Sequence, residues 1–217
     1  LLSELEAAGL AVRPGPAALV HAQDKALMRA RLGDELGLPS PRWKLCADAA
    51  SLRSFGDDVG WPLIAKESRG GYDGHGVWRI NGPQDCQQPF EQSLNVSAGE
   101  AVEVIGEEFI DFARELSVIV ARNPAGECVA YPVSETVQEH GICVETTTPA
   151  PGLDPVKALE IQELGRHIAA EPGVVGLLSV ELMERRDGTL VINARALRPP
   201  RPAPSPPPAA CAPVRPP

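Results

Sequence analysis

A glycine-rich segment at residues 66–78, "KESRGGYDGHGVW", places a lysine, a tyrosine, an aspartate and a histidine among four glycines. Segments of this kind often hold phosphates, because glycine lets backbone N–H groups approach a ligand closely. The chemistry to consider first is therefore the binding of a polyphosphate. The lysine in front of the glycines would supply positive charge.

The order of the glycines separates this segment from two common phosphate-binding loops. Gly71, Gly74 and Gly76 give G-x-x-G-x-G, which matches neither the Walker A motif nor the Rossmann fingerprint. The residues that follow, "VWRI", are typical of a strand and not of a helix. We therefore predict that the loop joins two antiparallel strands and lies over a polyphosphate. The alternative is an ordinary hairpin turn with surplus glycine.

Charged residues elsewhere in the chain could complete such a site. Lys66 ends the apolar strand candidate "PLIAK", so its ammonium group would emerge at the mouth of the site. Glu181 interrupts the apolar run "SVELM", where a carboxylate needs a cation or hydrogen-bond partners. Magnesium bound to nucleotide phosphates often meets that need through one or two carboxylates. The further candidates, each of which could also be a solvated surface charge, are Lys25, Glu107, Glu108 and Glu115.

Short strands mixed with a few helices must position these residues, which predicts an α+β fold. Helices are predicted at 1–15, 23–41, 48–60, 82–94 and 154–173. Strands are predicted at 42–46, 61–68, 76–80, 101–110, 114–123, 127–135 and 141–150, with a hairpin at 176–194. In the helix at 23–41, Met28, Leu32 and Leu36 share one face. The four successive strands between 101 and 150 suggest an antiparallel meander.

Composition excludes several classes of protein. The chain has 217 residues and a formal net charge of −9, which argues against a general affinity for nucleic acid. It has no apolar run near the roughly 18 residues that a membrane span needs. Five scattered cysteines, never at C-x-x-C spacing, argue against a zinc site or a disulfide framework and predict a reducing, cytoplasmic setting.

The last segment has a different composition. Ten of the nineteen residues at 199–217 are proline, so an extended or disordered tail outside any core is predicted. A shifted reading frame in GC-rich DNA would produce such a tail. Its P-x-x-P spacing also allows an interaction protein that binds through polyproline II.

Taken in order, several blocks resemble the ATP-grasp superfamily and, within it, the 5-(carboxyamino)imidazole ribonucleotide synthase family of purine biosynthesis. The blocks are "AQDK", "LGLPSPRW", "WPLIAKESRGGYDGHGVW", "EEFIDFARELSVIVAR", "AYPVSETVQEHGICVETTTPAP" and "GLLSVELM". The resemblance implies a truncated ATP-grasp fold. Its expected parts are a remnant of the N-terminal domain at 1–22, a lid subdomain at 23–106, a C-terminal ATP-grasp subdomain at 107–198 and the tail at 199–217.

The resemblance also implies a ligase that uses ATP and Mg²⁺ to carboxylate aminoimidazole ribonucleotide with bicarbonate, through carboxyphosphate. Intact members of the family are commonly dimers. The implied nucleotide-binding residues are Lys25, Lys66, Gly71, Gly74, Gly76, Glu107, Glu108, Phe109, Ile110, Glu115 and Gln138. Among them, Glu107 to Ile110 would read adenine through backbone groups, Glu115 would bind the ribose, and Gln138 stands where related enzymes often place a histidine. Glu181 would hold magnesium, and the implied catalytic residues are Tyr72, Asp73 and His75.

Departures from the family pattern leave alternatives open. His75 stands where the family has arginine, and Asn193 is followed by Ala194 where the family has a second magnesium-binding glutamate. The expected Arg-Pro-His-Asn-Ser-Gly-His run is replaced by "LRPPRPAPSPPPAA". Besides the ligase, the chain could thus be a catalytically impaired ATP-binding fragment of that family. It could also be another ATP-grasp carboxylate–amine ligase.

Overall fold

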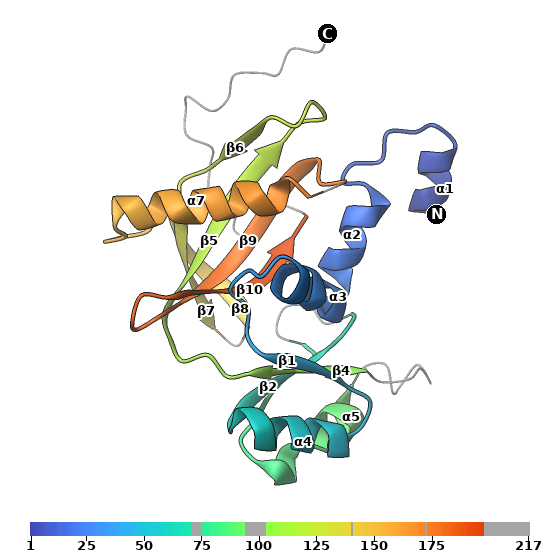
Figure 1. Cartoon of the computed structure of the whole chain (residues 1–217), viewed down its shortest axis with the longest axis vertical. Helices are drawn as coiled ribbons and strands as arrows, with labels where there is room; N and C mark the ends of the chain where they lie inside the picture. The colour runs from blue at the N-terminus through green and yellow to red at the C-terminus, as the bar shows by residue number, and fades with distance from the viewer. Residues whose placement is uncertain (71–74, 94–102, 140, 172, 198–217) are drawn as a thin grey trace.

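Two antiparallel sheets with helices around them make up the computed structural model, which describes residues 1–70, 75–93, 103–139, 141–171 and 173–197 (Figure 1). The smaller sheet contains β1 (Trp43–Cys46), β2 (Leu63–Glu67), β3 (Val77–Ile80) and β4 (Val104–Glu108), in the order β1-β4-β2-β3. The larger sheet contains β5 (Phe112–Arg122), β6 (Cys128–Ala130), β7 (Ser134–Glu139), β8 (Ile142–Thr147), β9 (Gly176–Arg185) and β10 (Leu190–Ala196). Its order is β10-β9-β5-β7-β8, with β6 paired to β5. The α+β class is confirmed.

Helices lie around both sheets (Figure 1). They are α1 (Leu2–Ala7), α2 (Pro16–Gln23), α3 (Lys25–Arg29), the π-helical η1 (Ala30–Glu35), α4 (Ala49–Val59), the 3₁₀ turn η2 (Pro83–Asp85), α5 (Gln88–Gln92) and α7 (Pro155–Ala169). In Figure 1, α4 and α5 lie on the side of the smaller sheet that faces away from the larger sheet, and α7 crosses the larger sheet. Within the described residues, no helix combines the length and hydropathy of a membrane span.

The smaller sheet forms because β2 alternates between buried and half-buried residues against α4. Leu63 and Ala65 are fully buried and share a core with Leu52 and Phe55 of α4. Asp48 accepts a hydrogen bond from the backbone N–H of Ser51, which satisfies a free donor at the start of α4. β2 and β3 pair antiparallel. The prediction that the glycine loop joins two antiparallel strands is therefore confirmed.

The predicted meander between 101 and 150 is wrong at its first strand. β4 leaves the following strands and pairs with β1 and β2 in the smaller sheet. Gly106 suits that place, because a Cβ there would lie 2.9 Å from side-chain atoms of both Leu52 and Phe55. β5 instead pairs with β9, β7 and β6. Order along the sequence could not show this, since strand pairing is decided by long-range packing.

The main core lies between α7 and the larger sheet. Ile161 and Ile168 of α7 are fully buried, and they belong to the same apolar cluster as Val118 and Val180 of the sheet. Gly165 lets the helix approach closely, because a Cβ there would be 3.0 Å from Val118. Ile161, Leu164 and Ile168 recur at three-to-four-residue spacing in the sequence, which is the spacing of one helix face, and this face packs into the core.

The predicted helix at 23–41 is present in two parts, α3 and the π-helical η1. Met28 and Leu32 are buried in the main core, and Leu36 packs against them, which confirms the predicted apolar face. Gly37, with φ +63°, follows the end of η1. A left-handed conformation of this kind is strained for other residues, so glycine suits the end of this helix.

Arg195 is a charged residue on the core side of β10. It is 5% exposed and lies between Ile192 and Leu197, which both belong to the main core. Its Nε and Nη1 atoms have no hydrogen-bond partner among the described residues. Burial lowers the pKa of this arginine, although the carboxylate of Glu171 partly opposes that effect. A buried donor without a partner is costly, so Arg195 weakens the fold.

Replacing this side chain should therefore stabilise the protein. We expect Arg195→Leu to raise the free energy of unfolding by about 1–3 kcal/mol, because it removes unsatisfied donors from the core. Denaturant unfolding followed by circular dichroism measures the change. Arg186→Leu is the matched control, because Arg186 is exposed and its replacement should stay within about 0.5 kcal/mol. A loss of stability in Arg195→Leu would contradict the interpretation.

Candidate functional site

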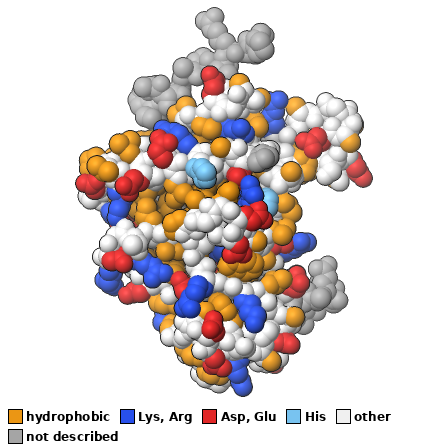
Figure 2. Space-filling view, viewed as in Figure 1, with side chains coloured by type: hydrophobic (Ala, Val, Ile, Leu, Met, Phe, Trp, Pro, Cys, Tyr) orange, Lys and Arg blue, Asp and Glu red, His pale blue; other side chains and the backbone are white. Residues whose placement is uncertain are grey.

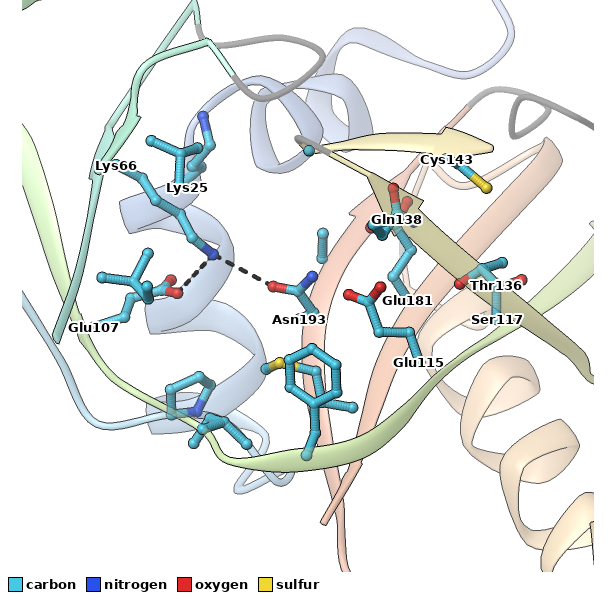
Figure 3. Close-up of a pocket in the computed structure, with 18 of the residues that line it drawn as sticks. Lys25, Lys66, Glu107, Glu115, Ser117, Thr136, Gln138, Cys143, Glu181 and Asn193 are labelled. Atoms are coloured by element: carbon cyan, nitrogen blue, oxygen red, sulfur yellow. Dashed lines mark hydrogen bonds and ion pairs between the residues drawn. The ribbon is translucent and has the colours of Figure 1, made fainter. Parts of the chain in front are cut away.

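A cavity of about 750 Å³ is lined by strands of both sheets and by the start of α3 (Figure 3). It brings together residues that are far apart in the sequence. Nine of the predicted binding residues line it: Lys25, Lys66, Glu107, Glu108, Phe109, Ile110, Glu115, Gln138 and Glu181. Its size suits a ligand of nucleotide dimensions, since such pockets usually measure about 300–1,000 Å³.

The remaining predicted residues belong to the glycine-rich loop. Gly71, Tyr72, Asp73 and Gly74 lie outside the described residues. His75 is exposed and Gly76 has φ +70°, and neither is among the residues that line the cavity. Their predicted roles stay predictions.

Two lysines give one end of the cavity its positive charge (Figure 3). Lys66 Nζ lies 2.8 Å from Oε2 of Glu107 and donates to Oδ1 of Asn193 at 3.3 Å. Lys25 Nζ donates to the backbone carbonyl of Glu67 at 2.9 Å. Burial lowers the pKa of Lys25, and the neighbouring charge of Lys66 lowers it further. An anion placed between the two ammonium groups would relieve this repulsion.

Arg29 holds this end of the cavity in place, and sequence reasoning missed it. Its side chain is fully buried, with Nε 2.6 Å from Oε1 of Glu107. Lys66 binds the other oxygen of the same carboxylate. Burial opposes the ionisation of Glu107, but Lys66 and Arg29 outweigh it and hold the pKa of Glu107 at about 2. The spacing from Lys25 was a usable signal, because residues four apart share one helix face.

The other nitrogens of Arg29 bind β10. Nη1 donates to the carbonyl of Ile192 and Nη2 to the carbonyl of Asn193, both at 2.7 Å. Consecutive carbonyls of a regular strand point in opposite directions, so one guanidinium reaches both only where the strand is distorted. The ladder between β9 and β10 has such an irregularity between Ile192 and Ala194. As a result, Asn193 and Ala194 both line the cavity although they are neighbours in the sequence.

Two carboxylates from β5 and β9 lie away from the lysine end. Figure 3 shows Glu115 and Glu181 extending from adjacent strands into the same part of the cavity. Burial raises the pKa of Glu115 to about 7, the charge of Glu181 adds to the effect, and Lys66 partly offsets it. Ala194 is the direct ladder partner of Glu181. A carboxylate such as Glu181 is the kind of ligand that magnesium bound to phosphates commonly takes. The described residues hold no cluster of three or more metal-binding side chains.

A polar wall on β5, β7 and β8 completes the cavity, and sequence reasoning missed most of it. Gln138 was predicted, but its neighbours in the wall were not. The missed residues are Ser117, Thr136, Cys143 and Thr146. The two-residue period of a strand would have placed Ser117 on the same face as Glu115. For β7 and β8 the pattern is weaker, because an irregularity between Val137 and Gln138 interrupts their ladder.

The fold and the site define a class of protein. A cavity between two antiparallel sheets, with lysines at one end and carboxylates from the larger sheet, is accompanied by a match of residues 31–201 to the ATP-grasp domain family. The chain belongs to the ATP-grasp family.

Within that family, the chain is similar to N5-carboxyaminoimidazole ribonucleotide synthases. It is 43% identical over 199 residues to the enzyme of Mycobacterium tuberculosis (strain ATCC 25618 / H37Rv), covering 92% of this chain and 45% of that relative. The synthase of Aspergillus clavatus complexed with ATP has a TM-score of 0.78 and 27% identity, covering 91% of this chain and 50% of that one. The same enzyme in complex with ADP and 5-aminoimidazole ribonucleotide gives a TM-score of 0.75 and 26% identity, covering 91% and 50%. The chain spans about half the length of the relatives it matches.

The pKa of Glu115 predicts how stability changes with pH. Because its folded-state pKa of about 7 lies above the ordinary value of 4.5, the folded state keeps a proton that the unfolded state has lost. Below pH 4.5 the carboxyl group of Glu115 is protonated in both states, so it does not affect stability. As the pH rises from about 4.5 to 7, the unfolded state loses this proton more readily than the folded state, and the free energy of unfolding falls. Across this window the unaltered chain should lose on the order of 2–3 kcal/mol of its free energy of unfolding, and Glu115→Gln should not show this loss.

Denaturant unfolding at pH 5 and at pH 8 gives the free energy of unfolding at each pH. The difference between the two pH values is then compared between the unaltered chain and Glu115→Gln. Glu160→Gln, an exposed position on α7, is the matched control and should leave the difference unchanged. An equal pH dependence in the unaltered chain and in Glu115→Gln would show that Glu115 does not carry it.

Proposed function

We propose that this chain is the nucleotide-binding part of an ATP-dependent ligase that carboxylates aminoimidazole ribonucleotide with bicarbonate. The observation that carries the proposal is the cavity, in which two lysines and two carboxylates occupy separate parts of one space. The related structures named above hold ATP, or ADP with 5-aminoimidazole ribonucleotide, which supports both the nucleotide and the substrate.

Different residues of the chain would bind different parts of the ligands. Lys25 and Lys66 would neutralise phosphate oxygens, and the glycine loop would cover the triphosphate and exclude water from a labile mixed anhydride. Glu115 would accept hydrogen bonds from ribose hydroxyls, and Glu107 to Ile110 would contact the adenine through backbone groups. Tyr72 and Asp73 would lie near the imidazole substrate.

Glu181 is the proposed magnesium ligand. A bound magnesium ion would offset negative charge on the phosphates during transfer. In the proposed reaction, an oxygen of bicarbonate attacks the terminal phosphorus of ATP and ADP leaves. The amine of the ribonucleotide then attacks the carboxyl carbon of carboxyphosphate and releases phosphate, with one proton lost from the amine. The site residues hold the reactants and shield them from water.

The second candidate is an ATP-binding chain without catalysis. It is favoured by Ala194, which stands opposite Glu181 and offers no carboxylate. The proposed dimer of the intact family, the polyproline tail and a different carboxylate–amine ligase rest on the sequence alone. Cys46, Cys86, Cys128 and Cys143 are free thiols, which supports the proposed cytoplasmic location.

Measurement of ADP release separates the two candidates. We expect the chain to bind ATP, and we expect Lys66→Met to weaken that binding about 10–100-fold, because a charge-assisted bond to phosphate is lost. Lys44→Met is the matched control, since Lys44 is exposed on β1. ADP release stimulated by aminoimidazole ribonucleotide and bicarbonate identifies the ligase. ATP binding without stimulation identifies the impaired form, and no ATP binding at all overturns both.

Restoring a carboxylate at position 194 tests the magnesium site. We expect Ala194→Glu to tighten Mg²⁺ binding in the presence of ATP about tenfold, because it adds a second carboxylate beside Glu181. Titration with Mn²⁺ followed by electron paramagnetic resonance measures the affinity. Ala196→Glu is the control, because Ala196 lines the same cavity but is the ladder partner of Ser179. Equal affinities in Ala194→Glu and the unaltered chain would contradict a metal site shared by Glu181 and position 194.

A further inference from the structure

Glu67, the last residue of β2, is a buried carboxylate at the base of the glycine-rich loop. Its exposed fraction is 1%. A Cβ added to Gly76 would lie 2.8 Å from its Oε2 atom, and one added to Gly70 would lie 4.0 Å from the same atom. The carboxylate therefore occupies the space between the two ends of the loop. Gly76 has φ +70° and Gly70 has φ +85°, so both ends also need the conformation that favours glycine.

Three further contacts hold Glu67 and connect it to the site. Ser93, a buried residue that follows α5, donates its hydroxyl to Oε1 of Glu67 at 2.7 Å. The backbone N–H of Glu67 donates to the carbonyl of Gly76 at 2.8 Å. Its own carbonyl accepts from Nζ of Lys25 at 2.9 Å. One residue thus contacts both the loop and a lysine of the cavity.

The chemistry of this position argues against packing alone. A buried carboxylate is expensive, and an apolar side chain of similar size would fill the same space at lower cost. The carboxylate also acts on the lysine electrostatically, because the charge of Glu67 is among those that raise the pKa of Lys25 against the effect of burial. The negative charge of Glu67 therefore helps to keep Lys25 protonated, in addition to filling the space between the ends of the loop.

We infer that Glu67, held by Ser93, is a positioning residue that fixes the two ends of the glycine-rich loop and keeps Lys25 ready for phosphate. The inference rests on the proposed nucleotide-binding function and adds a residue to it. Glu67 acts through the loop and through Lys25, so its removal should weaken the binding of the phosphates and leave the binding of the nucleoside unchanged.

Binding of ATP and of adenosine by isothermal titration calorimetry tests the inference in the full chain. We expect Glu67→Ala to weaken ATP binding at least about tenfold and adenosine binding less than about twofold. Glu67→Gln should lose less ATP affinity than Glu67→Ala but more than the control, because the amide oxygen still accepts from Ser93 and fills the same space while the charge that acts on Lys25 is gone. Glu91→Gln, an exposed position on α5, is the matched control.

The outcomes distinguish this inference from the proposed function. If the unaltered chain binds no ATP, the nucleotide proposal falls, and this inference with it. If it binds ATP and Glu67→Ala binds ATP equally well, the inference alone is wrong. Equal losses of ATP and adenosine would also overturn it, because they indicate general damage to the fold. If Glu67→Ala does not fold, Ser93→Ala decides, with a selective loss of ATP affinity expected and an unchanged affinity contradicting the inference.

Discussion

The cavity depends on one buried group of charges, in which Arg29 and Lys66 share the carboxylate of Glu107. Charges removed from water are costly, so these side chains are stable only in an arrangement where each meets its partner. Loss of one member would leave another buried without compensation, which typically costs about 3–5 kcal/mol. Because Arg29 comes from α3, Glu107 from β4 and the bound carbonyls from β10, the group also joins the smaller sheet to the larger one.

The same group explains the distribution of charge inside the cavity. With two cations and one anion, the Arg29, Glu107 and Lys66 group leaves an excess of positive charge at the lysine end, to which Lys25 adds. The carboxylates of Glu115 and Glu181 make another part of the cavity negative. Burial raises the pKa of Glu115 most, and repulsion by Glu181 raises it further. A ligand that carries phosphates together with a divalent cation satisfies both parts at once, which is why an ATP-grasp site fits these residues.

Much of the site could be predicted because its residues carry chemistry that strands and helices seldom need elsewhere. The glycine order and the following strand correctly predicted a hairpin, and Glu181 was recognised because it interrupts an apolar run. Arg29 was missed because arginine on a helix is usually solvated. The pairing of β4 was missed because the next strand in the sequence was taken as its neighbour, whereas Gly106 and α4 select the smaller sheet.

The sequence by itself determined the α+β class, the apolar faces of α3, η1 and α7, and many of the charged residues that line the cavity. Those features depend on local periodicity and on side-chain chemistry, which are present before the chain folds. Only the tertiary structure decided that Arg29 binds Glu107, that the irregularity in β10 turns both Asn193 and Ala194 toward the cavity, and that Glu67 lies between the ends of the glycine loop. Each of these is a contact between residues remote in sequence or a distortion fixed by such a contact, and no local pattern specifies it.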